Sequence, residues 1–236
     1  MLKGKVAWVT GATGGVGPAV VRALFDAGAK VVATARDDSR LTFLQAETQA
    51  DDGRWLAYAE DLTNPLAAHA VVEAASARFG GVDILIAVAG GWRGGAAVAS
   101  TELETLRWLL DINLVTAFNA CHAVLPGMLS RNWGRIVTLG ARSAVGGAAR
   151  SGAYAASKAA LLVLTHSIAA ETKQSGVTAN TLLLSTVDTP SNRSGMPEGD
   201  ASRWVAPEQI AAAVRFLCSE EAASINGAAI PIYGRA

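Results

Sequence analysis

The sequence is poor in cysteine and in charged residues, and each shortage excludes a class of protein. Its two cysteines, Cys121 and Cys218, lie far apart and match no metal-ligand spacing, so we expect two buried free thiols and no metal. Twenty basic residues balance twenty acidic ones, which leaves no net charge to attract nucleic acid or an anionic membrane. There is no signal-peptide pattern and no uninterrupted apolar run close to the ~20 residues of a membrane span. These absences favour a cytoplasmic protein.

What is abundant is apolar sequence, which makes up 51% of the 236 residues and is enough for one large core. Continuous apolar runs alternate with helical patterns, which is typical of strands buried on both faces of a parallel sheet. The expected strands are Val6–Thr10, Lys30–Thr34, Trp55–Tyr58, Ile84–Val88, Arg135–Leu139, Val177–Leu182 and Ala228–Ile232. The expected helices are 16–27, 64–79, 101–131, 152–175 and 207–217. We therefore predict an α/β fold over 1–236: a single-domain, Rossmann-type, doubly wound parallel sheet of about seven strands.

One long segment, Asp188–Trp204, is rich in Pro, Gly, Ser and Asn. Loops of this length inside a compact domain usually have a function. The segment follows the sixth expected strand, so it should lie over the carboxyl edge of the sheet, where such folds bind ligands. We expect a substrate lid near 188–204, with an ordinary surface loop as the alternative.

A glycine-rich turn, Thr10-Gly11-Ala12-Thr13-Gly14-Gly15-Val16-Gly17, connects the first strand to a helix that begins near Pro18. Glycines allow unusual backbone dihedrals and let a pyrophosphate approach the backbone at a helix N-terminus. The turn lacks the strict G-x-G-x-x-G pattern of dinucleotide sites. By itself it therefore leaves open either dinucleotide binding or a tight turn with no ligand.

The turn matches the Thr-Gly-x-x-x-Gly-x-Gly signature of the short-chain dehydrogenase/reductase family, and the resemblance covers nearly the whole chain. Asp61-Leu62 resembles the family's adenine-contacting Asp, Asn113 its helix-kink Asn, and Tyr154 with Lys158 its Tyr-x-x-x-Lys motif. The resemblance implies an NAD(P)-dependent oxidoreductase. The expected cofactor-binding residues are Gly11, Thr13, Gly14, Gly15, Val16, Gly17, Asp61, Leu62, Ala89, Gly90, Tyr154, Lys158 and Thr189, together with Arg36, which is expected from its charge at the end of the second strand.

Tyr154 and Lys158 are four residues apart, so on a helix they share one face. A tyrosine with its ordinary pKa of about 10 is a poor base near neutrality, and a nearby ammonium should lower that pKa. We therefore expect Tyr154 to act as the acid or base, assisted by Lys158. The resemblance implies that Asn113 anchors a water linking Lys158 to solvent, although a buried Asn that satisfies backbone groups fits the same position.

The chain departs from the family at the usual catalytic serine, about 13 residues before the tyrosine, where Ala141 stands. Ser143 is two residues away and replaces it only if the loop shifts. Further departures, Ala87-Val88-Ala89-Gly90 and Leu184-Ser185, resemble one subgroup, the dihydropteridine reductases. The other matching stretches are Val88–Gly95, Thr138–Ala141, Asp188–Arg193 and Met196–Glu198.

That subgroup implies hydride transfer to a conjugated ring such as a quinonoid dihydropteridine, for which a serine aimed at a carbonyl matters less. Trp92 offers an aromatic face for a flat substrate. Arg193, Arg93 and Arg142 are candidates for polar contacts, and Ala141 should border the substrate. Two alternatives stay open: a carbonyl or 3-oxoacyl reductase that uses Ser143, and a dinucleotide-binding protein with little turnover.

The dinucleotide preference depends on the end of the second strand, where NAD sites usually place an acidic residue. Here Ala35 precedes Arg36 and Asp37. Because an arginine can bind a 2′-phosphate by charge-assisted hydrogen bonds, we expect NADP(H) to be preferred, with NAD(H) possible. The resemblance to dihydropteridine reductases, which favour NADH, points the other way.

The two expected long helices, 101–131 and 152–175, are rich in Ala, Leu and Val. They are more apolar than one buried face requires, and in this family such helices commonly form a dimer interface. We expect a homodimer or homotetramer, unless other parts of the chain cover both faces.

Overall fold

The computed structural model describes residues 2–235, and a seven-stranded sheet runs through them in the order β3-β2-β1-β4-β5-β6-β7. All neighbouring strands pair in parallel, as the continuous apolar runs predicted. The strands are β1 (Val6–Thr10), β2 (Lys30–Ala35), β3 (Trp55–Ala59), β4 (Ile84–Ala87), β5 (Gly134–Ala141), β6 (Val177–Leu184) and β7 (Ala229–Ile232). The strand order reverses beside β1 and β4, which is where doubly wound sheets bind ligands.

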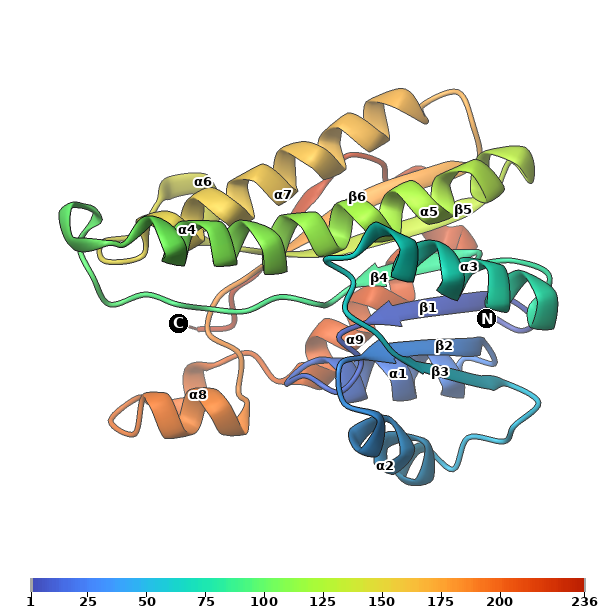
Figure 1. Cartoon of the computed structure of the whole chain (residues 1–236), viewed down its shortest axis with the longest axis horizontal. Coiled ribbons are helices and arrows are strands. Elements are labelled where there is room, and N and C mark those ends of the chain that lie inside the picture. The colour runs from blue at the N-terminus through green and yellow to red at the C-terminus, as the bar shows by residue number, and fades with distance from the viewer. Residues whose placement is uncertain (1, 236) are drawn as a thin grey trace.

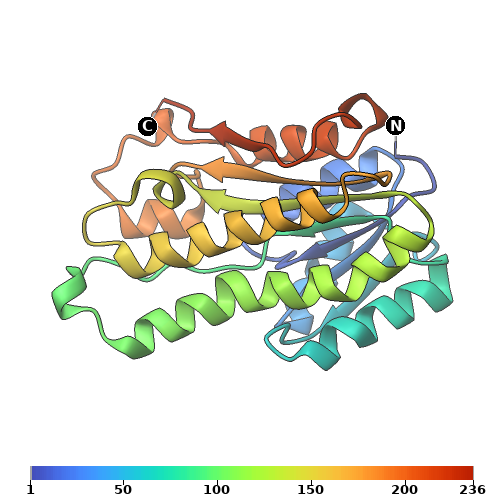
Figure 2. The same ribbon diagram turned by 90° about the horizontal axis from the view of Figure 1, so that it is seen from above.

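Helices cover both faces of the sheet (Figures 1 and 2). They are α1 (Gly17–Asp26), α2 (Asp38–Thr48), α3 (Pro65–Phe79), α4 (Leu103–Leu110), α5 (Thr116–Ser130), α6 (Ser143–Gly146), α7 (Gly152–Glu171), α8 (Pro190–Gly195) and α9 (Pro207–Leu217). Alternate residues of one strand belong to different cores. Ala7 and Val9 pack with α1, α2 and α9, whereas Val6 and Trp8 pack with α3, α5 and α7. This double burial explains why β1 is apolar at every position.

Helix α2 is absent from the helices expected from the sequence. Most of its side chains are exposed, and only Leu41 and Leu44 are buried, so its apolar pattern is weak. Its N-terminus is capped by Asp37, whose carboxylate accepts from the Arg40 backbone N–H at 3.2 Å. The missed helix matters because it begins at the carboxyl edge of the sheet, beside the glycine-rich turn.

The expected helix 101–131 is found as α4 and α5 joined by a π-helical turn, Asp111–Val115. Single π turns inside helices are frequent at functional sites. The segments Leu103–Ser130 and Gly152–Glu171 are long and apolar enough to cross a membrane by length and composition, although neither is an uninterrupted apolar run. In the fold, 50% and 39% of their most apolar windows are buried, and the rest of each window faces outward.

The segment expected as a lid, 188–204, lies after β6 and contains helix α8 and a short 3₁₀ turn, Ala201–Arg203. It is therefore partly helical where the sequence indicated a loop. Helix α8 projects from the carboxyl edge, apart from the other helices on its side of the sheet (Figure 1).

Candidate active site

The glycine-rich turn is shaped by close backbone approaches at its glycines. Gly11 has φ +60°, and a Cβ there would lie 2.7 Å from the Cα of Ala89, whose N–H donates to Thr10 Oγ1 at 3.1 Å. A Cβ at Gly15 would lie 2.6 Å from Cγ2 of Thr189, the residue that caps α8. The glycines thus bring Ala89 and Thr189 against the turn.

The turn ends at the N-terminus of α1, where Val16 occupies the cap position and supplies no side-chain hydrogen bond. The first backbone N–H groups of a helix favour an anion such as a pyrophosphate. Gly14 lies in the same turn, and its N–H donates to Gly11 O at 3.0 Å. The turn fits the phosphates of a dinucleotide, because it leads into a helix N-terminus with no side-chain cap and a Cβ at Gly14 would meet only the Gly11 carbonyl, at 3.3 Å.

Two further expected cofactor residues, Asp61 and Leu62, follow the end of β3. Asp61 is exposed after β3, and hydrogen bonds from Thr63, together with the charge of Arg36, hold the pKa of its carboxyl below the usual range. Leu62 is buried, and its carbonyl accepts from Asn119. Asp61 is therefore ionised and solvent-facing, as an adenine contact requires.

Asn113 lies in the π turn, is fully buried and binds the loop after β4. Its Oδ1 accepts from Gly91 N–H at 3.0 Å, and its Nδ2 donates to Gly91 O at 3.0 Å and to Ser157 Oγ at 3.1 Å. A Cβ at Gly90 would lie 2.7 Å from Asn113 Oδ1 and 3.3 Å from Lys158 Nζ. Asn113 therefore does satisfy backbone groups, and it sits beside Lys158. Ser157 was not expected in this cluster, since a lone serine in a helix carries no sequence signal.

Tyr154 and Lys158 project from the first turns of α7, and both are desolvated. Burial raises the pKa of Tyr154 to about 12 and lowers the pKa of Lys158 to about 8. The ammonium donates to Leu139 O of β5 at 2.8 Å. The expected lowering of the tyrosine pKa is thus wrong for the protein without ligand, because desolvation dominates and the lysine proton points to a backbone carbonyl.

The position of the family's serine is at the end of β5. Ala141 is buried there, 6% exposed, and Ser143 is the first residue of α6, which packs on α7. Ala141 has no hydroxyl, and Ser143 lies two residues beyond the end of the strand.

Arginines gather where β2 ends and α2 begins. Arg36 is exposed, and its positive charge is close enough to Asp61 to help lower the pKa of that carboxyl. Arg40 donates from its guanidinium to Thr13 O at 2.5 Å, which connects α2 to the glycine-rich turn. Sequence reasoning missed Arg40 because it missed α2. The carboxylate of Asp37 is used in capping that helix.

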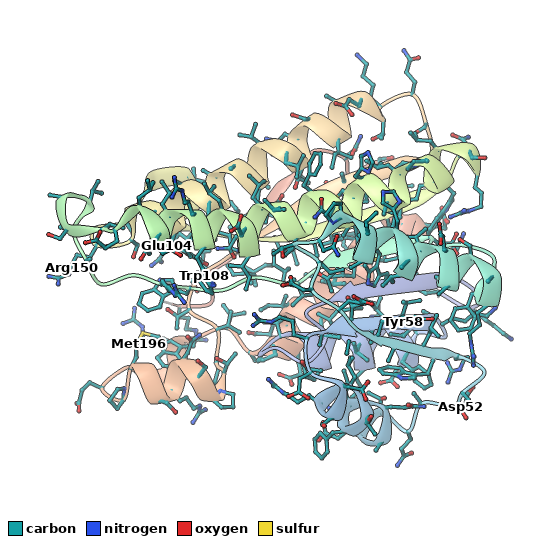
Figure 3. All side chains as sticks on the ribbon, viewed as in Figure 1. Asp52, Tyr58, Glu104, Trp108, Arg150 and Met196 are labelled. Carbon is teal, nitrogen blue, oxygen red and sulfur yellow. The ribbon has the colours of Figure 1, made fainter. Side chains whose placement is uncertain are left out.

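The loop after β4 carries Trp92, which is 61% exposed. A Cβ at Gly94 would lie 2.6 Å from the Trp92 ring, and one at Gly91 would lie 2.7 Å from the Trp108 ring. Gly91 and Gly94, which have no side chains, therefore leave room for the indoles of Trp108 and Trp92. Figure 3 shows Trp108 pointing from α4 toward α8, from whose end Met196 points back.

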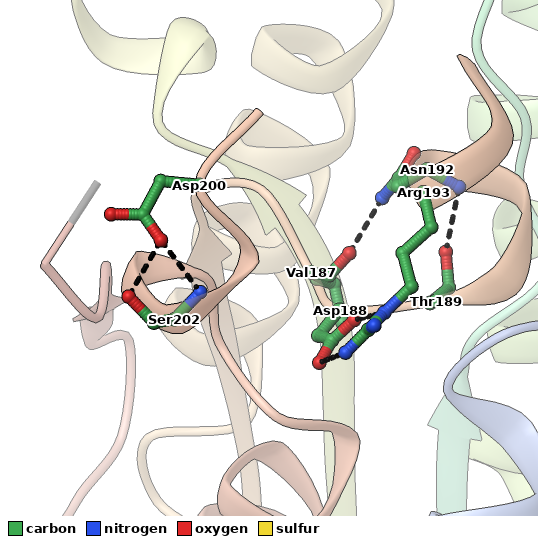
Figure 4. A network of polar contacts seen from close by, with 7 residues as sticks. All are labelled: Val187, Asp188, Thr189, Asn192, Arg193, Asp200 and Ser202. Atoms are coloured by element: carbon green, nitrogen blue, oxygen red, sulfur yellow. Dashed lines mark hydrogen bonds and ion pairs between the residues drawn. The ribbon is translucent and has the colours of Figure 1, made fainter. Parts of the chain in front are cut away.

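Arg193 does not stand free for a substrate. Its Nε and Nη2 donate to the two carboxylate oxygens of Asp188 at 2.6 and 2.8 Å (Figure 4). Asn192 also donates to Val187 O, and Thr189 accepts from Asn192 N–H. The ion pair lowers the pKa of Asp188, and the network fixes α8. Arg193 is thus engaged in an internal ion pair while its side chain stays 62% exposed, and its expected substrate contact stays a prediction.

The sequence profile described as short chain dehydrogenase matches residues 5–198. The chain belongs to the short-chain dehydrogenase family. The 3-oxoacyl-[acyl-carrier-protein] reductase FabG of Vibrio cholerae is 36% identical over 99% of this chain and 97% of its own length. The D-threitol dehydrogenase of Mycolicibacterium smegmatis is 35% identical over 99% and 93%.

Solved structures agree with this short-chain dehydrogenase fold. The crystal structure of gox2181 has a TM-score of 0.92 at 29% identity and covers 99% of this chain and 95% of that one. ElxO with NADP bound has a TM-score of 0.91 at 19% identity, over 98% and 97%, and its likeness concerns the fold. The protein is thus an oxidoreductase of a family that uses NAD(P).

Proposed function

We propose that this oxidoreductase reduces a conjugated ring, such as a quinonoid dihydropteridine, with NAD(P)H. The observation that carries the proposal is Ala141, a buried methyl group at the end of β5, two residues beyond the carbonyl that binds Lys158. A ketone develops negative charge on one oxygen during reduction and gains from a hydroxyl there. A conjugated imine-like ring places that charge largely on nitrogen and needs the hydroxyl less.

Three side chains would have separate roles in this reaction. The bound dinucleotide supplies the hydride, and ring reduction also takes one proton. Tyr154 holds its proton at neutral pH, because burial raises its pKa to about 12, and donates it to the ring. Lys158 keeps its charge at pH 7, because burial lowers its pKa only to about 8, and would hold the ribose of a bound dinucleotide. Asn113 holds Gly91, and with it the loop that carries Trp92.

Reduction of a 3-oxoacyl thioester is the second candidate, favoured by the 36% identity to a reductase of that kind. Ser143 would then have to supply the missing hydroxyl from α6. A binding protein with little turnover is disfavoured by the intact cluster of Asn113, Tyr154 and Lys158.

The test measures NADPH oxidation with quinonoid dihydropterin and with an acetoacetyl thioester. We expect turnover of the pterin, a change within about twofold for Ser143→Ala, and a loss of on the order of a hundredfold or more for Tyr154→Phe. Preferred turnover of the thioester with a large loss in Ser143→Ala would establish the second candidate. No turnover of either substrate, with NADPH still bound, would favour a binding protein.

We propose NADP(H) as the preferred cofactor. Arg36 is exposed at the end of β2 and Arg40 reaches the glycine-rich turn, so two guanidinium groups are close to the expected ribose. Asp37 has its carboxylate engaged at the start of α2. NAD(H) remains the competing donor, and a higher kcat/KM with NADH would reject the proposal.

We also propose a homodimer or homotetramer in the cytoplasm. Helices α4, α5 and α7 expose Leu103, Phe118, Leu129 and Val163, each at least 46% exposed, which a second copy would cover. Both cysteines are buried free thiols, in keeping with a reducing compartment. Light scattering on the purified protein should give a multiple of 24.2 kDa, and a monomer would contradict the proposal.

A further inference from the structure

A cavity of about 400 Å³ lies between the loop that follows β4 and the start of α7. Trp92, Arg93, Glu102 and Arg150 contribute to its lining. Ala153 lines it as well and directly precedes Tyr154, so the cavity adjoins the first turn of α7, from which the proposed acid projects. It is large enough for a bicyclic ring, since ligand pockets begin at about 300 Å³.

The three charged side chains in this lining do not pair with one another. Within residues 2–235, Glu102 forms no ion pair with Arg93 or Arg150. The guanidinium of Arg93 lies 4.0 Å from the ring centroid of Trp108, an arrangement that leaves its N–H edge available. A carboxylate that lines a cavity without an ion-pair partner, as Glu102 does among the described residues, is available to a ligand.

Arg150 is fixed in place and limits one side of the cavity. Its backbone has φ +61°, a left-handed conformation that a non-glycine residue adopts at a cost. Two hydrogen bonds hold it: its Nε donates to Gly95 O at 2.6 Å, and its own carbonyl accepts from Gly95 N–H at 2.8 Å. Figure 3 shows Arg150 at the end of the molecule where α4 begins. The loop with Trp92 is thereby tied to the loop before α7, so the cavity is preorganised.

The lining specifies the chemistry of the ligand. An exposed indole favours a flat ring, and a carboxylate accepts two parallel N–H bonds. A ring amino group beside a ring N–H presents those two donors, and a neighbouring ring carbonyl accepts from a guanidinium. A quinone or ketone has no such donors, so it would gain no hydrogen bond from the exposed Glu102 carboxylate.

We propose that this cavity binds the 2-amino-4-oxopyrimidine edge of the substrate. Glu102 is its specificity-determining residue, accepting from the amino group and the ring N–H, while Arg93 donates to the ring carbonyl and Trp92 stacks on the ring. The inference rests on the proposed reduction of a conjugated ring and narrows it to rings that carry an amino-pyrimidinone edge.

The test compares Glu102→Gln with the wild type in steady-state reduction by NADPH. The matched control is Glu104→Gln, an exposed glutamate of α4 outside the cavity lining. The substrates are quinonoid dihydropterin and a benzoquinone. For Glu102→Gln we expect KM for the pterin to rise on the order of 10- to 100-fold with kcat within about twofold, because a hydrogen-bonded charge is lost. Values for the benzoquinone, and all values for Glu104→Gln, should stay unchanged.

Calorimetric titration of the protein with tetrahydropterin gives a second readout that needs no turnover. If the wild type reduces the pterin and Glu102→Gln keeps the same KM and affinity, the subsite is wrong and the proposed reaction stands. If the wild type fails to reduce the pterin but binds it in a Glu102-dependent way, the subsite stands and the proposed reaction is wrong. If the wild type neither reduces nor binds it, both are rejected.

Discussion

Replacing Lys158 by Met should change how the stability of the cofactor-free protein depends on pH. The side chain is 6% exposed, and burial lowers the pKa of its ammonium to about 8 from an ordinary 10.5. Methionine keeps an apolar stem of similar length and removes the charge. The free energy of unfolding of the wild type, measured relative to Lys158→Met, should therefore rise as the pH is raised above 8.

The direction follows from proton uptake. Below pH 8 the lysine is charged in both states, and the folded protein bears the whole cost of the buried charge, about 3 kcal/mol for this pKa shift. Between pH 8 and 10.5 the unfolded chain binds more protons than the folded one, so stability increases with pH. Between pH 7 and 9.5 the gain is about 2 kcal/mol. The lost bond to Leu139 shifts the variant's stability by nearly the same amount at every pH.

Urea unfolding followed by tryptophan fluorescence, at half-unit steps from pH 7 to 9.5, measures this difference. Lys173→Met is the matched control: Lys173 is exposed just beyond α7, and its removal should leave the pH dependence of the wild type unchanged. Parallel curves for the wild type and Lys158→Met across the range would refute the argument that burial makes this lysine an easily deprotonated group.

Three further predictions concern the cofactor side of the site. Asn113→Ala removes three hydrogen bonds, one to Ser157 that is buried and two to Gly91 that are partly buried, and should lower the free energy of unfolding by about 2–4 kcal/mol, measurable by urea unfolding. Arg36→Ala should lower kcat/KM for NADPH by on the order of tenfold or more and leave that for NADH within about threefold, and equal losses with both donors would reject a 2′-phosphate contact. Gly15→Ala places a methyl group 2.6 Å from the side chain that caps α8, so NADPH should bind on the order of tenfold more weakly in a fluorescence titration.

Most of the fold could be predicted from local patterns of apolar residues in the sequence. The strand runs predicted the seven-stranded sheet, with ends within about two residues of the observed ones, because strands buried on both faces have no polar positions to confuse the pattern. Helix α2 was not predicted, because only Leu41 and Leu44 are buried and two positions do not make a helical apolar pattern. The lid segment was located by its composition, but helix α8 within it was missed, since its six residues are too few to show a helical period.

The site, like the fold, was predicted from the sequence only in part. The sequence by itself determined that the glycine-rich turn, Asn113, Tyr154 and Lys158 belong to one family of oxidoreductases, because their types and spacing are fixed by backbone geometry along single elements. Tertiary structure decided the interactions between elements. Arg193 pairs with Asp188, and burial, not the lysine, governs the pKa of Tyr154. Glu102 and Arg93 line one cavity with Arg150, which is far from both in the sequence. Desolvation and charge pairing depend on which segments pack together, and residues as distant as Gly95 and Arg150 meet only in the folded chain.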